Sequence, residues 1–328
     1  MIRPQFTSLV ETYNTSATFP TVEWDENTKI NYPRIKKSNS VWNLFGLFLA
    51  PEDKAVVLVG ASPCLARDAE KLRECDDDFR IISVNSALKF LLNKGVKPHY
   101  VIALDSDTPD LYEHLDVDSK DLTLIASNIV SPKVLDNWKG KIWFMPYYSL
   151  TDKKLQKRLR AKLGKTVYPA GNALGTALSL SVQVLGARIF VLVASECCYE
   201  KNYYPSKAIK RSNVKGVEWF IPDINGNERV TTSALHVYKL WLEMAAVNTY
   251  PYTKIIDTSE GILGVDKRSR IYTYELSEII RRIKEANVKK REVQSYAQDI
   301  MRDATLQSQR SFGEMPGGTS RVDVRSDV

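Results

Sequence analysis

The sequence has few histidines and cysteines, the residues on which several classes of protein depend. It contains three histidines and four cysteines in 328 residues. The cysteines, Cys64, Cys75, Cys197 and Cys198, show neither zinc-ligand spacing nor a CxxC pair. The sequence therefore predicts neither a structural zinc site nor a disulfide-bonded secreted scaffold. Reduced thiols in the cytoplasm are the simpler interpretation.

Long apolar segments are also missing. No apolar run reaches the roughly 18–20 residues that span a bilayer. The first residues, MIRPQFTSLVETYN, lack the apolar centre of a signal peptide, and no internal repeat is present. The 44% apolar and 26% charged content are those of an ordinary globular chain. The sequence thus favours a cytoplasmic protein without a transmembrane segment.

Positive charge exceeds negative charge, with 46 basic and 39 acidic residues and a net charge of +7. Much of the excess lies in three segments, residues 153–165, 207–215 and 267–291. Such clusters suit a phosphate-bearing ligand, a nucleic acid or an anionic membrane surface, and solvated helix faces are the alternative. Net charge leaves these interpretations open, so a nucleic acid bound through a basic face stays among the predicted partners.

Short β-branched segments alternate with helical patterns from residue 55 onwards. Strands are predicted near 55–59, 80–84, 100–104, 122–126, 141–145, 188–194 and 254–259. Helices are predicted between the first strands, over 151–163, after Gly171, over 233–248 and over 271–292. This alternation is typical of parallel βαβ units. The sequence therefore predicts an α/β, Rossmann-like, mostly parallel sheet of about six strands flanked by helices.

Composition changes on either side of this predicted domain, which covers residues 51–292. Residues 1–50 predict an N-terminal arm, extended to about residue 40, and then a short packing helix over 42–51. Within the domain, the aromatic and basic residues 196–230 predict a lid with a small hairpin around Asn225-Gly226. Residues 293–328, rich in Gln, Ser, Arg, Gly and Asp, predict a flexible tail that is disordered from residue 303.

Small, amide-bearing and acidic residues follow the first three strands. They are Gly60, Ala61, Ser62 and Pro63 after the first strand, Asn85 and Ser86 after the second, and Asp105, Ser106 and Asp107 after the third. In open α/β sheets ligands bind outside the carboxyl ends of the strands. These residues are therefore predicted to meet at one edge of the sheet and to hold a nucleotide. The Gly60 turn could bring backbone amides to a phosphate, or could serve only as a tight turn.

Two further features could hold the charged part of a nucleotide. Asp105 and Asp107 are the candidate metal ligands, because two carboxylates at one strand end can bind a Mg²⁺ that bridges a diphosphate. The motif is short, and a helix cap is the alternative. Gly171 and Asn172 begin a helix of small residues whose N-terminus suits an anion. Close packing of that helix on the sheet is the alternative there.

The order of these motifs resembles a known superfamily. In chain order they are a Gly-x-x-Pro turn (60–63), NSAL (85–88), GVKPHY (95–100), a strand ending in Asp105, AGNALGTA (170–177), LGARI (185–189), a Tyr-rich loop and a His-bearing helix. The series is similar to the domain of the MptE-like 6-hydroxymethylpterin diphosphokinases and the motility-associated flagellin glycosyltransferases. More distantly, it resembles bacterial CMP-sialic-acid sialyltransferases. The resemblance covers about residues 54–265.

The resemblance implies a nucleotide-dependent transferase and assigns roles to further residues. Tyr203 and Tyr204, with Tyr199 beside them, would donate hydrogen bonds to the phosphate of the donor as it leaves. His236 would be the general base that takes the proton of an acceptor hydroxyl, and Asn85 would contact the nucleotide. An aromatic cluster that holds the loop, and a histidine that only packs, are the alternatives.

Three departures from the family pattern bear on the choice of reaction. Ser62 and Cys64 replace a glycine and a serine of the first turn, His99 stands where relatives usually carry an Asp, and the HAHGDN segment of the archaeal diphosphokinases is absent. The resemblance therefore implies, first, glycosyl transfer from a nucleotide-activated sugar to a hydroxyl acceptor. Second comes Mg²⁺-dependent diphosphoryl transfer from ATP to a hydroxymethyl acceptor. A non-catalytic member that binds a nucleotide, a nucleic acid or a protein is third.

Overall fold

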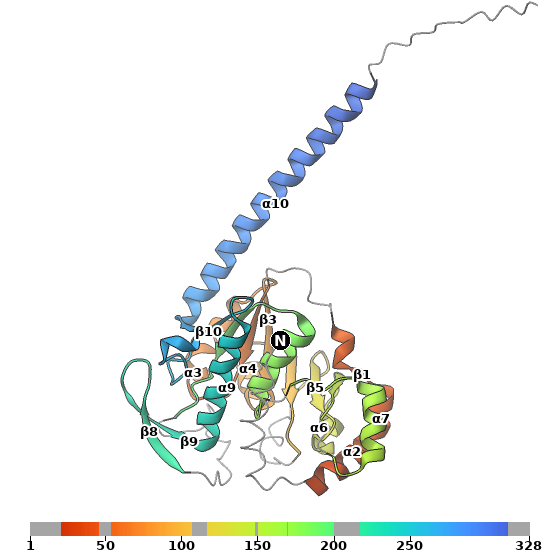
Figure 1. Cartoon of the computed structure of the whole chain (residues 1–328), viewed down its shortest axis with the longest axis vertical. Helices are drawn as coiled ribbons and strands as arrows, with labels where there is room; N and C mark the ends of the chain where they lie inside the picture. Colours follow the sequence, from red (N-terminus) through yellow and green to blue (C-terminus); the bar gives the residue numbers. More distant parts are fainter. Residues whose placement is uncertain are drawn as a thin grey trace, which may run out of the picture. The chain divides into compact units, whose positions relative to one another are not determined.

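Nine strands form one parallel sheet in the residues that the computed structural model describes, which are 21–45, 54–106, 117–147, 150–168, 170–199 and 217–313 (Figure 1). In spatial order they are β1 (Asn39–Ser40), β6 (Lys141–Met145), β5 (Thr123–Ser127), β4 (Tyr100–Ala103), β3 (Phe79–Val84), β2 (Ala55–Val59), β7 (Ile189–Val193), β10 (Lys254–Asp257) and β11 (Ile271–Thr273). This sheet confirms the predicted Rossmann-like α/β class. It has more strands than predicted, because β1 and β11, at its two edges, have only two and three residues and show no period.

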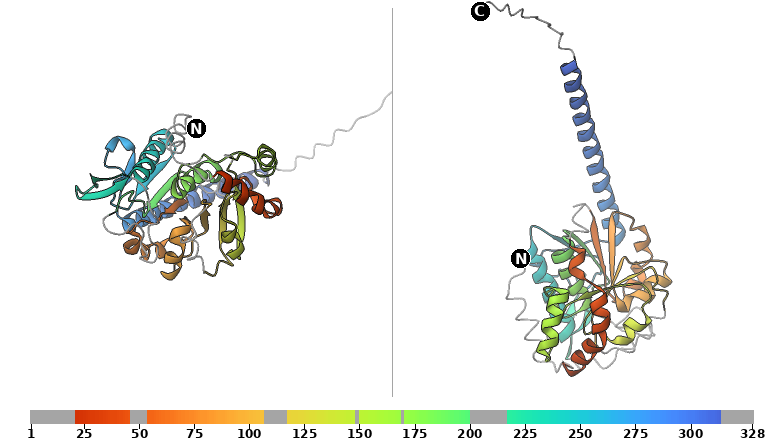
Figure 2. Two further views of the ribbon diagram at one scale, coloured as in Figure 1. Left: turned by 90° about the horizontal axis from the view of Figure 1, so that it is seen from below. Right: turned by 90° about the vertical axis from the view of Figure 1, so that its right-hand side faces the viewer.

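Helices cover both faces of the sheet. Figure 2 shows α3 (Leu65–Asp68), α4 (Asn85–Asn93) and α6 (Pro132–Asn137) on one face, and α7 (Lys153–Leu163), α8 (Ala173–Leu180) and α9 (Ser233–Thr249) on the other. Right-handed crossovers explain this arrangement. The chain passes from β2 towards β6 with its helices on one face, and from β7 towards β11 in the opposite direction with α9 on the other. Shorter helical turns are η1 (Val41–Leu44), η2 (Lys71–Glu74), η4 (Ser181–Leu185) and η5 (Lys267–Ser269).

The order of the strands reverses between β2 and β7. β2 pairs with β3 on one side and with β7 on the other, so the connections that follow β2 and β7 diverge. All five residues of β2 are buried, as expected for a strand covered on both faces. Such a reversal is the topological switch point at which open α/β sheets bind ligands.

The predicted extended arm over residues 1–40 is wrong for residues 21–40. Thr21–Lys37 form the helix α2, and β1 joins the sheet beside β6. Buried polar contacts hold α2, since Asn31 Nδ2 donates hydrogen bonds to the carbonyls of Asn128 (3.2 Å) and Val130 (2.8 Å). Polar contacts of this kind leave no hydrophobic period in the sequence, which is why the helix was not predicted.

The predicted hairpin is present as β8 (Glu218–Pro222) and β9 (Glu228–Thr232), an antiparallel pair. Its turn contains Gly226 at φ +82°. The rest of the predicted lid, residues 200–216, lies outside the described residues. Of the packing helix predicted over 42–51, residues 42–44 belong to the short helical turn Val41–Leu44, and residues 46–51 lie outside the described residues.

Helix α10 (Leu276–Gly313) begins and ends later than the predicted 271–292. Residues 293–313 are therefore helical, although a flexible tail was predicted. The stretch contains no proline, its only glycine is its last residue, Gly313, and its Gln, Ala, Arg, Leu and Met residues favour helices. The chain divides into two compact units, Met1–Arg281 and Arg282–Val328; the predicted domain boundaries at residues 50 and 292 stay predictions. No helix in the described part of the chain combines the length and apolar character that crossing a membrane requires.

Candidate functional site

A cavity of about 250 Å³ lies at the switch point, at the carboxyl ends of the strands. It is bounded by the segments that follow β2, β3, β4 and β7, by the start of α8 and by α9. The lining residues are Gly60, Ala61, Ser62, Val84, Asn85, Ser86, Asp105, Gly171, Asn172, Ala173, Leu174, Ala194, Ser195, Cys197, Cys198, Leu235 and Tyr238. The structure thus brings together most of the residues predicted to bind a nucleotide, from four separate parts of the sequence.

The close approach of β7 explains the glycine after β2. A Cβ atom at Gly60 would lie 2.2 Å from the carbonyl oxygen of Ala194. The Gly60 amide also donates a hydrogen bond to the Val193 carbonyl (2.8 Å). Packing alone therefore requires a glycine at this position. Because Gly60 has no side chain, its backbone forms this part of the cavity wall.

Two more amides of the β2 turn are bonded within the protein. Ser62 N–H donates to the Ala194 carbonyl (3.2 Å), and Cys64 N–H donates to the Glu196 carboxylate (3.0 Å). The helix that follows, α3, has only four residues, so it adds little dipole. The turn holds a carboxylate of the protein itself where the sequence predicted a phosphate. Pro63 belongs to this turn but is not among the residues that line the cavity.

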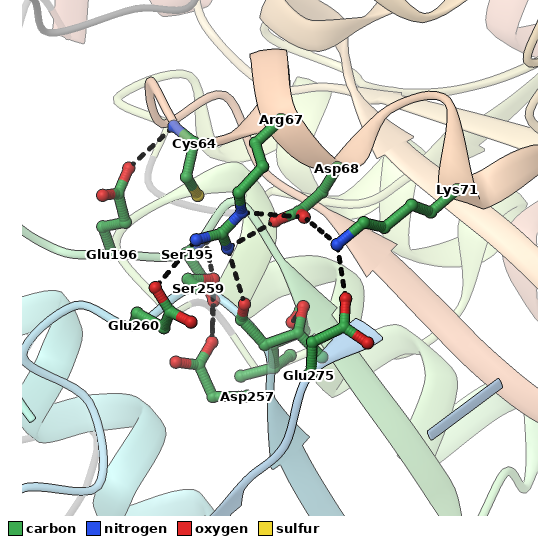
Figure 3. Close-up of polar contacts among 12 residues, drawn as sticks. Cys64, Arg67, Asp68, Lys71, Ser195, Glu196, Asp257, Ser259, Glu260 and Glu275 are labelled. Atoms are coloured by element: carbon green, nitrogen blue, oxygen red, sulfur yellow. Dashed lines mark hydrogen bonds and ion pairs between the residues drawn. The ribbon is translucent and has the colours of Figure 1, made fainter. Parts of the chain in front are cut away.

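A network of charged residues follows the β2 turn (Figure 3). Arg67 forms a bidentate pair with Asp68 (2.9 and 2.7 Å) and bonds Glu260 (2.8 Å). Lys71 pairs with Asp68 (3.3 Å) and with Glu275. The Asp68 side chain is only 1% exposed, and the two cations offset the cost of burying its charge. The network fixes α3 to the segments that follow β10 and β11, and so holds the β2 turn in place.

The side chain of Asn85 lies in the cavity wall with an unsatisfied amide. Asn85 is only 5% exposed, and its Nδ2 has no hydrogen-bond partner among the described residues. A buried donor without a partner costs about 1–3 kcal/mol. Asn85 is the first residue of α4, whose N-terminus has no side-chain cap. An acceptor atom on a ligand in the cavity would supply the missing partner.

The start of α8 also faces the cavity. Asn172 caps this helix, since its Oδ1 accepts a hydrogen bond from Gly175 N–H (2.7 Å). Gly171 precedes the cap at φ +78°, a conformation that glycine adopts readily. Ala173 and Leu174, in the first turn, line the cavity, and first-turn amides have no partner within a helix. Close packing is present too, because a Cβ at Gly175 would meet the Ala170 side chain at 2.6 Å.

The backbone after β7 is strained where it borders the cavity. Ala194 and Cys197 have φ values of +53° and +55°, which are uncommon for residues other than glycine. Both residues line the cavity. Strain of this kind clusters at binding and catalytic sites, which supports a functional role for this cavity.

A buried carboxyl group lies behind the Ser195 wall of the cavity. Ser195 Oγ donates to Asp257 Oδ1 (2.6 Å), and Ser259 Oγ donates to the same oxygen (2.9 Å). Asp257 is fully buried, and burial raises its pKa to about 6. Ser195 was not predicted as a site residue, although it directly follows a predicted strand, as Gly60 and Asn85 do.

The two adjacent cysteines contribute protonated thiols to the cavity. Burial raises the pKa of Cys198 to about 12 and that of Cys197 well above its ordinary value. The thiolate is the reactive form of cysteine, so neither residue is suited to act as a nucleophile at neutral pH. Both are free cysteines and form a small, polarisable part of the wall.

Tyr199 fastens the hairpin to the end of β7. Its hydroxyl donates to the Glu218 carboxylate (2.5 Å), and its backbone pairs with Val230. Tyr199 does not line the cavity, so its contacts favour the structural alternative over nucleotide binding. Tyr203 and Tyr204 lie outside the described residues.

His236 lies on α9 next to the cavity wall but is not part of the lining. Its ring meets Trp219 of β8 edge to face, with the centroids 5.4 Å apart. Burial and the nearby Lys239 lower the pKa of His236, which keeps the imidazole neutral at neutral pH. Leu235 and Tyr238 on the same helix line the cavity, and neither was predicted.

Of the two predicted metal ligands, Asp105 lines the cavity and Asp107 lies outside the described residues. Within the ranges that the structure describes, no group of three or more His, Cys, Asp and Glu side chains could hold a metal ion. Mg²⁺ is often held by one or two carboxylates together with substrate phosphates. Asp105 could be one such ligand, and a Mg²⁺ there would neutralise phosphate charge.

Fold and site together define a doubly wound α/β protein with a ligand cavity at its topological switch point. Residues 26–202, more than half of the 328-residue chain, match the family described as 6-hydroxymethylpterin diphosphokinase MptE-like. The chain belongs to the MptE-like family, as the order of its motifs indicated.

A solved structure with a similar fold is the MAf glycosyltransferase from Magnetospirillum magneticum AMB-1. The two share 18% sequence identity with a TM-score of 0.54, over 68% of this chain and 34% of that one. At this identity the likeness concerns the fold, and this chain spans about a third of the length of that protein. No curated protein matches the sequence.

Proposed function

We propose that this chain is a nucleotide-dependent transferase that moves a glycosyl group from a nucleotide-activated sugar to a hydroxyl acceptor. The observation that carries this proposal is the switch-point cavity with the unpaired Asn85 amide in its wall. Membership of the MptE-like family supports a transferase in general, and the fold of a glycosyltransferase supports the kind of group transferred. Free cysteines support the proposed cytoplasmic location.

The charged part of the donor would lie at the start of α8 rather than at the β2 turn. The Ser62 and Cys64 amides already have partners, whereas the first turn of α8 presents amides to the cavity at the positive end of a helix dipole. Asn85 Nδ2 would donate to an oxygen of the nucleotide. Gly60, Ala61 and Ser86 would form the wall along which the nucleotide lies. Tyr203 and Tyr204 keep their proposed role at the leaving phosphate.

His236 is the proposed general base. Its lowered pKa leaves the imidazole free to take the proton of the acceptor hydroxyl, as the hydroxyl oxygen bonds to the sugar carbon and the nucleotide phosphate departs. Because His236 contacts Trp219 and lies beside the cavity lining, the acceptor would approach from the side of the β8–β9 hairpin.

A Mg²⁺-dependent diphosphokinase is the second candidate. The description of the family and the position of Asp105 in the cavity lining favour it. In that case ATP would be the donor, and a hydroxymethyl group would accept the diphosphoryl group. Mg²⁺ dependence separates this candidate from glycosyl transfer with a histidine base.

A thermal-shift panel tests both candidates. The protein is heated with CMP, UDP, GDP, AMP and ATP, each with Mg²⁺ and with EDTA, and an Asn85→Ala variant is compared with the wild type. A ligand that binds only the folded state adds about 2.7 kcal/mol of stability at a hundredfold excess over Kd. We expect Asn85→Ala to unfold at nearly the wild-type temperature and to lose much of the ligand-induced shift, because no bond within the described protein is removed.

Asn93→Ala is the matched control, since Asn93 is exposed at the other end of the same helix. A shift that persists in EDTA and falls in Asn85→Ala alone supports the proposed glycosyl transfer. A shift with ATP that requires Mg²⁺ supports the diphosphokinase. An absence of any shift, or an equal shift in all three proteins, would contradict the assignment of this cavity to a nucleotide.

A further inference from the structure

Helices α2 and α7 run in parallel along one edge of the domain (Figure 2). Their starts are joined because the Asp25 carboxylate accepts hydrogen bonds from the amides of Thr151 (3.1 Å) and Asp152 (3.1 Å). Their ends are joined because Ser40 Oγ donates to the Leu163 carbonyl (2.6 Å). The two helices therefore form one rigid surface with both ends fixed.

This surface carries positive charge that the described protein does not neutralise. The sequence of α7, KKLQKRLRAKL, has six cations and no acidic residue. Its three leucines are buried, so the cations lie on the solvent side. The last turn of α2 adds Lys36 and Lys37, whereas Arg34 in the same turn pairs with Asp136. We call α7, Lys165 and the last turn of α2 the basic surface. Among the described residues, ion pairs are absent for Lys154, Lys157, Arg158, Lys162 and Lys165.

Exposed apolar side chains flank the basic surface. Phe45 follows η1 and is 62% exposed. The indole N–H of Trp42 donates to the Lys165 carbonyl (2.5 Å), so η1 and Phe45 adjoin the end of α7. On α2, Ile30 is 59% exposed. Cations with large apolar side chains at their border are typical of proteins that bind at a membrane–water interface.

We propose that the basic surface binds an anionic lipid surface. Two parallel helices present an even face, and five of the seven cations on α7 and at Lys165 are lysines, which attract anionic headgroups as point charges. Phe45 and Ile30 would enter the headgroup layer beside them. Nucleic-acid surfaces more often offer Arg for bidentate phosphate contacts. Binding here is independent of the chemistry in the cavity.

Co-sedimentation of the full chain with vesicles tests this proposal. Vesicles of phosphatidylcholine are compared with vesicles in which about a third of the lipid is phosphatidylserine. The test variant replaces Lys154, Lys157, Arg158 and Lys162 by Gln. The control variant replaces Lys97, Lys120, Lys254 and Lys267 by Gln, which removes the same charge from exposed positions outside the basic surface. Thermal unfolding of both variants verifies that they fold.

We expect the wild type and the control to bind the anionic vesicles. The test variant should bind about tenfold or more weakly, because each lost cation weakens binding several-fold. Wild-type binding should also fall as salt increases. The proposal is overturned if both variants bind equally, or if neutral vesicles bind as well as anionic ones. It is also overturned if the wild type does not bind vesicles but binds a single-stranded oligonucleotide with steep salt dependence. That result would assign the surface to a nucleic acid.

Discussion

The contact between Gly60 and β7 makes a Gly60→Ala variant informative about the whole site. The added Cβ would lie 2.2 Å from the Ala194 carbonyl oxygen, whereas contacts of real Cβ atoms are essentially never below 3.0 Å. The two strands must therefore separate by about 0.8 Å at this point, which is the difference between these distances. The neighbouring atom is part of the backbone, so no side-chain rotation can relieve the contact.

The expected cost has two parts. Overpacking of a buried site costs about 1–3 kcal/mol. Separation of the strands also weakens the bond from Gly60 N–H to the Val193 carbonyl (2.8 Å), and a hydrogen bond of this kind contributes about 0.5–1.5 kcal/mol. We expect Gly60→Ala to lower the free energy of unfolding by about 2–4 kcal/mol.

Urea unfolding followed by circular dichroism gives this free energy. Gly226→Ala is the control, because Gly226 is in the hairpin turn at φ +82° with nothing within 4 Å of the added Cβ. Its cost is limited to backbone strain, about 1 kcal/mol. If Gly60→Ala is as stable as the wild type, or no less stable than Gly226→Ala, then packing does not explain the glycine and a ligand contact becomes the better account of its presence.

Two further predictions concern ionisable groups. The folded pKa of Asp257, about 6, is above its ordinary value of 3.8, so this group favours the folded state below pH 3.8 and loses that contribution as the pH rises through 6. The free energy of unfolding of Asp257→Asn minus that of the wild type, measured in urea, should therefore be larger at pH 7 than at pH 4, by on the order of 1–3 kcal/mol. An equal difference at the two pH values would contradict this. Cys198, whose pKa is raised to about 12, should react slowly with iodoacetamide in the native protein at pH 8, as measured by mass spectrometry, and rapid labelling there would show that its thiolate is stabilised.

The central strands could be predicted because each is a short apolar run. β2, all of whose residues are buried, has the predicted bounds, since strands that are covered on both faces read as continuous apolar segments. β6, next to the edge strand β1, also has the predicted bounds, although only its last two residues are buried. Helix α2 could not be predicted in this way. Its Asn27 and Asn31 are buried and bond to carbonyls about a hundred residues away, and such contacts are invisible to a search for hydrophobic period.

The candidate site was predicted in outline because parallel strands carry their following residues to one edge. Gly60, Asn85 and Gly171 meet in one cavity for this reason. The bond between Glu196 and the Cys64 amide could not be predicted, because it depends on how far the loop after β7 reaches across the switch point. Tyr238 was missed since its place in the lining follows from the rotation of α9 about its axis.

The position of β7 in the sheet has a consequence for synthesis of the chain. Among the long strands that the structure describes, β2 is synthesised before the others, yet one of its two neighbours, β7, begins at Ile189. Until then β2 has an unpaired apolar edge, and such edges invite association with other chains. The cavity is complete only after Tyr238 has been added. During this part of synthesis the nascent chain can therefore aggregate through the unpaired edge of β2, and no ligand can stabilise it by binding in the cavity.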